Sequence, residues 1–133
     1  MLLYLFYNAD LLDVARGPDE KSLSYVDDVA FMAMANSFTQ MHRILKSMML
    51  WAQGGFRWSK AHNSNFKTSK SVLMDLSRSK SAIHPPLSIR GMTIATVSTH
   101  KFLGVMYAGS GAPVGASGQL RDRQSHHVDI SIL

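Results

Sequence analysis

The stretch Ser22-Leu-Ser-Tyr-Val-Asp-Asp-Val-Ala-Phe-Met-Ala-Met34 decides the fold of this chain. It holds two short apolar runs, residues 22–26 and 29–34, which are separated only by Asp27-Asp28. Two such runs with a two-residue connection predict an antiparallel β-hairpin, because aspartate tolerates the turn dihedrals better than most residues. Adjacent carboxylates repel each other, so an acidic pair at an apolar tip favours a divalent cation, and Mg²⁺ prefers such oxygen ligands. A bare acidic pair is nevertheless more often a solvated turn.

Apolar spacing predicts a helix on each side of this hairpin. Residues 2–15 are expected to form a mostly buried helix, and the Gly17-Pro18 pair begins a loop after it. A second helix is predicted over residues 37–53, where apolar side chains recur every three or four positions. Asn36 or Ser37 would cap this helix, and Gly54-Gly55 would end it.

The remaining chain predicts short strands and a tail. The expected elements are a loop with a possible short strand at 56–70, a strand at 71–76, a hairpin of Leu87–Ile89 and Met92–Ile94 around Arg90-Gly91, and a last strand at 100–107. Glycine, alanine and serine dominate the residues that follow, so 108–133 is expected to be a flexible tail. The predicted class is α+β, with a hairpin and a small sheet packed on helices over residues 1–107.

Composition and charge limit the kinds of site and partner that this chain can have. The 133 residues suffice for one small domain, and the absence of cysteine excludes disulfides and thiolate zinc sites. The net charge of +5 divides into −4 over residues 1–28 and +9 over residues 29–133. Such a basic body fits a polyanionic partner, although lysines that only hydrate a surface would give the same charge. Without a long apolar run or a basic leader, the chain is expected to be soluble, with no membrane partner, and these features leave its compartment open.

Four segments in order give a family resemblance. Tyr25-Val-Asp-Asp28 between two apolar strands resembles motif C of reverse transcriptases, the RNA-directed DNA polymerases. Residues 2–12 resemble the helix after the Gln-Gly-Ser-Pro motif in enzymes of fungal non-LTR (LINE-like) retrotransposons. A similarity to motif D is spread over three segments, which are Trp51-Ala-Gln, His62-Asn-Ser-Asn-Phe-Lys-Thr-Ser-Lys70 and Val72-Leu-Met-Asp-Leu76. A similarity to motif E lies in His100-Lys-Phe-Leu-Gly-Val105. The resemblance covers about residues 2–106 and implies part of a polymerase palm.

This resemblance implies roles for particular residues. Asp27 and Asp28 would be catalytic ligands of Mg²⁺, and Tyr25 and Val26 would shape the floor beneath the primer terminus. Lys70 would protonate the pyrophosphate leaving group, although a plain surface lysine would look the same. The residues implied in primer or nucleic-acid binding are, besides Tyr25 and Val26, Lys67, Lys101, Phe102, Leu103 and Gly104, of which Phe102 and Leu103 could equally be packed in a strand. The partners of the complete enzyme would be an RNA template, a DNA primer and deoxynucleoside triphosphates, with the nucleus as a plausible compartment.

The chain also departs from the family pattern. Reverse transcriptases carry a further metal-binding aspartate in motif A, upstream of the Gln-Gly-Ser-Pro motif, and this chain begins after both. We therefore expect no polymerisation by the isolated chain and an open sheet edge beside the hairpin. The alternative is a catalytically silent, basic nucleic-acid-binding remnant. A set of basic residues with Trp58 and Phe66 interleaved would follow a nucleic-acid backbone in either case, and a merely hydrated loop would look similar. These basic residues are Arg57, Lys60, Lys67, Lys70, Arg78 and Lys80.

Overall fold

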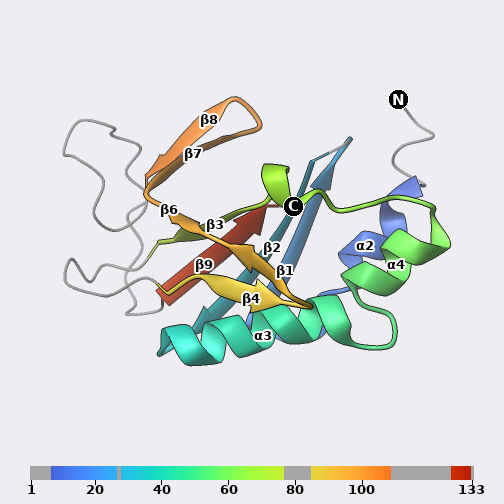
Figure 1. Cartoon of the computed structure of the whole chain (residues 1–133), viewed down its shortest axis with the longest axis horizontal. Coiled ribbons are helices and arrows are strands. Elements are labelled where there is room, and N and C mark those ends of the chain that lie inside the picture. Colours follow the sequence, from blue (N-terminus) through green and yellow to red (C-terminus); the bar gives the residue numbers. More distant parts are fainter. Residues whose placement is uncertain (1–6, 27, 77–84, 109–126, 133) are drawn as a thin grey trace.

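The structure is a computed structural model that describes residues 7–26, 28–76, 85–108 and 127–132. It is an α+β fold around a five-stranded sheet in the order β1-β2-β9-β3-β6, with two small two-stranded sheets beside it (Figure 1). The strands of the large sheet are β1 (Glu20–Tyr25), β2 (Asp28–Ala35), β3 (Val72–Asp75), β6 (Thr96–Val97) and β9 (His127–Ile132). The predicted α+β class is confirmed.

The predicted hairpin around the acidic pair is present as β1 and β2. The two strands pair antiparallel from Glu20 opposite Ala33 to Tyr25 opposite Asp28. Because Tyr25 and Asp28 are partners, the connection is Val26-Asp27 and not Asp27-Asp28, one residue earlier than predicted. Asp28 is therefore the first residue of a strand.

The expected tail is wrong for its last part, because β9 lies in the middle of the sheet. It pairs antiparallel with β2, where Ala33 lies opposite Asp129, and antiparallel with β3, where Asp75 lies opposite the same residue. The edge of β2 that was expected to be open is consequently paired. Residues 109–126, which belong to the same predicted tail, lie outside the described residues.

Helix α3 (Phe38–Leu50) covers one face of this sheet (Figure 1). Its first turn is capped by Ser37, whose hydroxyl accepts a hydrogen bond from the Gln40 backbone N–H at 3.3 Å, as the sequence predicted. The face of α3 that points to the sheet is apolar and buries Met41, Leu45 and Met48. Alternating residues of β2, such as Phe31 and Ala33, meet it and form the main core.

Two shorter helices pack at the end of α3. The predicted helix over 2–15 is described only as α2 (Ala9–Leu12), which buries Leu11, while residues 1–6 lie outside the described residues. The glycine pair that was expected to end a helix instead begins α4 (Gly55–Ala61), with Gly54 at its N-cap. Most of the loop predicted at 56–70 is therefore helical, because α4 is followed by the 3₁₀ turn η1 (Thr68–Lys70).

The two small sheets are both hairpins. Strands β4 (Leu87–Ile89) and β5 (Met92–Ile94) have the predicted bounds, and their buried leucine and isoleucine side chains join the main core. The last predicted strand is wrong, because it is two strands, β7 (Thr99–Phe102) and β8 (Val105–Ala108). Phe102 anchors this hairpin on the sheet face opposite α3, where it packs against Ala30, Met32 and Val72.

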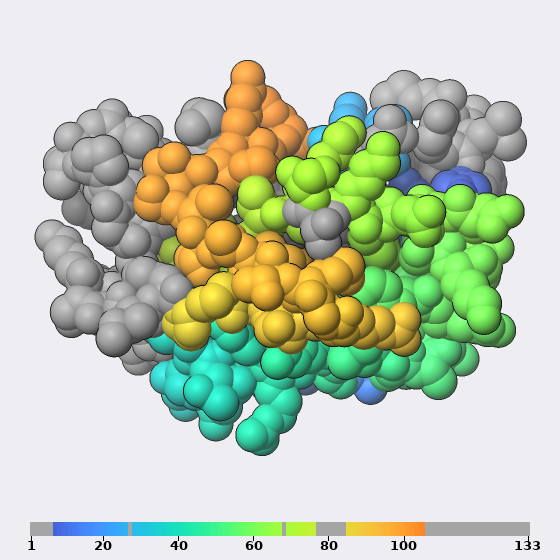
Figure 2. Space-filling model, in the orientation of Figure 1, coloured from blue at the N-terminus to red at the C-terminus, as the bar shows by residue number. Residues whose placement is uncertain are grey.

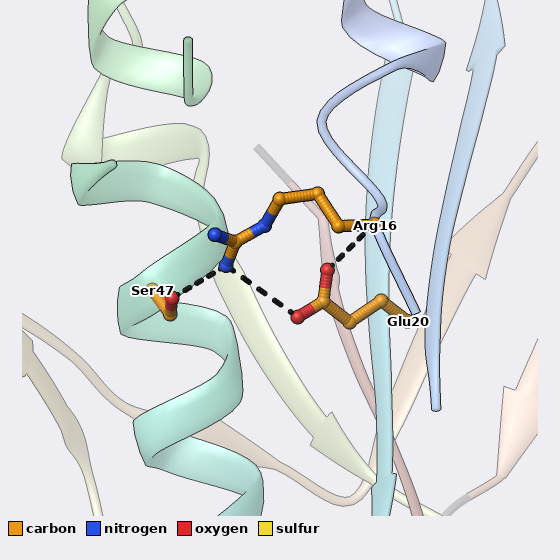
Figure 3. A network of polar contacts seen from close by, with 3 residues as sticks. All are labelled: Arg16, Glu20 and Ser47. Atoms are coloured by element: carbon orange, nitrogen blue, oxygen red, sulfur yellow. Dashed lines mark hydrogen bonds and ion pairs between the residues drawn. The ribbon is translucent and has the colours of Figure 1, made fainter. Parts of the chain in front are cut away.

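A polar network ties the start of β1 to α3 (Figure 3). Arg16 donates a hydrogen bond from Nη2 to Ser47 Oγ at 2.6 Å, and the same atom lies 3.7 Å from Glu20 Oε1. Glu20 also accepts a hydrogen bond from the Arg16 backbone N–H at 2.8 Å. The guanidinium lies 4.5 Å from the centre of the Trp51 ring, so one cation joins the loop before β1 to the end of α3.

Candidate functional site

The tip of the β1–β2 hairpin holds an unusual backbone. Val26 has a φ of 53°, in the left-handed region that β-branched side chains strongly disfavour. The next residue, Asp27, lies outside the described residues. Asp28 is exposed at the start of β2, and its cross-strand partner Tyr25 is 54% exposed. The tip therefore presents one carboxylate and one aromatic ring to solvent side by side.

A second turn lies at the same edge of the molecule. The β7–β8 hairpin reverses at Leu103-Gly104, whose φ values are 50° and 82°. Figure 1 places this turn and the β1–β2 tip toward the same side, and in Figure 2 the orange atoms of β7 and of the turn after it project there. Leu103 is 47% exposed, so it belongs to the turn and not to a packed strand.

Between these two turns lies an open hollow of about 610 Å³. Its lining consists of Tyr25, Val26, Asp28 and Leu103. Four residues singled out from the sequence thus lie together, although the two segments are far apart in the chain. The hollow is open, and the described residues give it an apolar wall on each side and the carboxylate of Asp28, which suits a ligand that carries both a flat apolar group and a bound cation.

The other predicted site residues lie elsewhere. Lys67, Lys70 and Lys101 are exposed, Lys70 as the last residue of η1, and none of them lines the hollow. Phe102 is buried and anchors its hairpin, while Gly104 supplies the positive φ of the turn. The basic loop was also expected to offer aromatic rings for stacking on nucleic-acid bases, and the structure differs from that expectation.

Trp58 and Phe66, which were interleaved with the basic residues of that loop, both pack on the core. Trp58 is only 7% exposed, and Phe66 is packed against the main core. The ring of Trp58 stacks on His62 at 4.5 Å between centroids and meets Tyr7 edge-on at 5.5 Å. The aromatic side chains of this loop therefore stabilise α4 and are not free to stack on nucleic-acid bases.

Sequence reasoning missed one residue that touches the tip. Asn8 is 8% exposed, and its side-chain Nδ2 donates a hydrogen bond to the Val26 carbonyl oxygen. In the sequence Asn8 lies inside the stretch that was predicted as one continuous helix. The available signal was that Asn8 interrupts the apolar run of residues 1–7.

A smaller hollow of about 280 Å³ lies beside α4. Its polar lining is mixed in charge, since Asp10, Asp13 and Arg57 all line it. None of the residues to which the resemblance gives a catalytic or binding role lines this smaller hollow.

Two further properties of the described residues bear on chemistry. His42 on α3 has a pKa below its usual value, because burial disfavours the charged ring and Lys46 repels it, while Asp75 opposes the shift. Over the described ranges, no three histidine, aspartate or glutamate side chains gather closely enough to hold a metal ion by themselves. Within the same ranges, no helix is long and apolar enough to cross a membrane.

No protein-family model, curated protein or solved structure matches the chain.

Proposed function

We propose that this chain is part of the palm of an RNA-directed DNA polymerase of the non-LTR retrotransposon type. The observation that carries the proposal is the shared hollow at the two turns. It brings Tyr25, Val26 and Asp28, from the segment that resembles motif C, against Leu103, from the segment that resembles motif E. A primer terminus placed there would contact apolar side chains on both walls and lie beside a carboxylate.

The exposed carboxylate of Asp28 fits the cation that this function needs. Mg²⁺ is commonly held by one or two carboxylates together with water and the phosphates of a substrate, so a large cage of side chains is not required. Asp28, with Asp27 before it in the chain, would hold the ion. When bound, Mg²⁺ would neutralise the negative charge of the nucleotide phosphates.

Polymerisation needs more carboxylates than the described residues of this hollow supply. Two-metal phosphoryl transfer clamps both the attacking and the leaving oxygens, whereas the described lining contains the single carboxylate of Asp28. We therefore propose that the chain by itself binds a primer–template without extending it. Magnesium-dependent primer extension that Asp28→Asn abolishes would contradict this part of the proposal.

Binding of a fluorescein-labelled RNA template–DNA primer, followed by fluorescence anisotropy, tests the function. We expect Mg²⁺ to tighten binding by the unchanged chain and to have no such effect on Asp28→Asn. Leu103→Ala is expected to weaken binding, because it removes one wall of the hollow. Leu50→Ala is the matched control, since Leu50 on α3 is similarly exposed at 43% and does not line the hollow.

The silent nucleic-acid-binding remnant predicts a different result. In that case only net charge matters, so Asp28→Asn would bind slightly more tightly with or without Mg²⁺. Leu103→Ala and Leu50→Ala would then behave alike. That pattern would overturn the polymerase proposal.

A further inference from the structure

Asn8 lies between the helical residue Tyr7 and the start of α2, and its side chain does not cap the helix. It is the N-cap residue of α2, where an asparagine side chain ordinarily accepts a hydrogen bond from the first turn of the helix. Its side chain makes no such bond, and its backbone is in the right-handed helical region instead of the extended region usual for a cap. The amide group is directed to the hairpin, where it donates to the Val26 carbonyl oxygen.

The acceptor of this bond is a group that the hairpin itself does not satisfy. In a two-residue connection the carbonyl of the first turn residue takes no part in the strand ladder. Val26 is that residue, because Tyr25 and Asp28 are the last paired positions. Asn8 is almost fully buried, so an unpaired amide there would be costly, and the two polar groups satisfy each other.

The same contact acts on a backbone that is disfavoured without support. Val26 has a positive φ, and a residue held in such a conformation persists only when its surroundings fix it. The bonded carbonyl belongs to the peptide group that joins Val26 to Asp27. A donor fixed in the buried part of the molecule therefore sets the orientation of the peptide immediately before the acidic pair.

We propose that Asn8 is a positioning residue for the acidic tip: its amide holds the Val26 peptide so that the turn leads into β2 with the Asp28 carboxylate presented for a divalent cation. This inference rests on the proposed function for its cation, and it adds a residue from outside the hairpin to the site. Hydrogen-bonding partners behind a ligand carboxylate ordinarily change metal affinity by about tenfold or more when they are removed.

Ser22 provides a matched control within the same contact. Its hydroxyl donates a hydrogen bond to the Leu11 carbonyl oxygen at 2.6 Å, so it also joins the hairpin to α2. Ser22 lies three positions from Tyr25 and does not touch the tip. If Asn8 acted only by docking α2, then Ser22→Ala and an Asn8 variant would have the same effect.

The test is an NMR titration of the whole chain with Mn²⁺, which broadens the amide signals of residues near a bound ion. We expect broadening at Tyr25 and Asp28 in the unchanged chain, and an increase of about tenfold in the half-saturating Mn²⁺ concentration for Asn8→Leu. Ser22→Ala is expected to match the unchanged chain. A scalar coupling between Asn8 Nδ2 and the Val26 carbonyl carbon, measured in the unchanged chain, tests the contact even if Asn8→Leu does not fold.

The outcomes separate the two proposals. Equal Mn²⁺ affinity in Asn8→Leu and the unchanged chain, an equal loss in Ser22→Ala, or the absence of the scalar coupling would each overturn the role of Asn8. Absence of broadening at the tip of the unchanged chain would overturn the cation site. The role of Asn8 in holding the tip would then be decided by the coupling and by whether Asn8→Leu shifts the Asp28 amide signal.

Discussion

Val26 stores strain at the tip of the hairpin. Its left-handed backbone costs about 1–2 kcal/mol for a residue with a side chain, and the branch at Cβ makes valine a poor choice. Asparagine accepts this conformation most readily among the residues with a side chain. Val26→Asn is therefore expected to raise the free energy of unfolding by about 1 kcal/mol, as measured by urea denaturation.

A branched replacement separates backbone strain from side-chain contacts at the same position. Val26→Ile keeps the branch at Cβ and should give no gain in stability. If Val26→Ile stabilised the chain as much as Val26→Asn does, the positive φ would not be the source of the effect.

His42 makes stability depend on pH. Its pKa is lowered in the folded protein, chiefly by burial, so the unfolded chain binds a proton more readily than the folded one does. Stability from this residue is fully present above the ordinary histidine pKa of 6.5 and falls as the pH drops below it. We expect the melting temperature to fall as the pH is lowered from about 7.5 to about 5.5. In His42→Gln the melting temperature should depend less on pH over this range. His100→Gln is the control, and an equal flattening there would assign the effect to another cause.

At the residue scale the sequence predicted the contents of the site better than its geometry. Tyr25, Val26, Asp28 and Leu103 were all singled out, and they share one hollow. The register of the turn was wrong by one residue, because aspartate's tolerance of turn dihedrals favoured Asp27-Asp28 as the connection. The contact from Asn8 could not be foreseen, since it joins residues that are distant in sequence and depends on how α2 docks.

The β7–β8 hairpin depends on a single anchor. Phe102 is 7% exposed and fills the space above Ala30, whereas the neighbouring Leu103 projects into the hollow. Phe102→Ala is expected to lower the free energy of unfolding by about 3 kcal/mol, and Leu103→Ala to leave it nearly unchanged. Thermal and urea denaturation of the two variants measure this difference. Similar losses in both would mean that Leu103 is packed as well.

Elements with strong local signals were predicted well, and those defined by tertiary contacts were not. The β4–β5 hairpin follows from Arg90-Gly91, whose φ values are both positive, as a tight hairpin turn requires. The prediction that the glycine pair at 54–55 only ends a helix was wrong, because these glycines also allow the chain to turn sharply and start the next helix. A Cβ on Gly54 would lie 2.4 Å from the Met48 carbonyl oxygen, so the glycine lets α4 start directly against the end of α3.

At the scale of the whole molecule, β9 unites two halves of the sheet. Strands β2 and β3 are both antiparallel to β9, so they are parallel to each other and are connected through α3, with β9 between them. This is a split β-α-β arrangement. The alternation of Val128, Ile130 and Ile132 with polar residues is a local strand signal that the prediction of a tail overlooked. The place of β9 at the centre of the sheet has no local signal, because the pairing is entirely long-range.

A proline in β9 tests this architecture. Ile130 pairs with Met32 on one side and Met74 on the other, so Ile130→Pro should interrupt the sheet at its centre. Hydrogen exchange is expected to accelerate in both β2 and β3. Val105→Pro in β8 is the control, because it should affect only the small β7–β8 sheet. Unchanged protection of β2 and β3 in Ile130→Pro would contradict the central position of β9.

The order of synthesis gives the central strand a further consequence. The ribosome makes β1, β2 and β3 well before β9, which follows every other strand in the chain. Until β9 leaves the exit tunnel, the inner edges of β2 and β3 have no partner, and open edges readily pair with other chains. A nascent chain of this protein would therefore depend on chaperones until β9 has emerged, and its yield should rise when chaperones are abundant and fall when translation is slow.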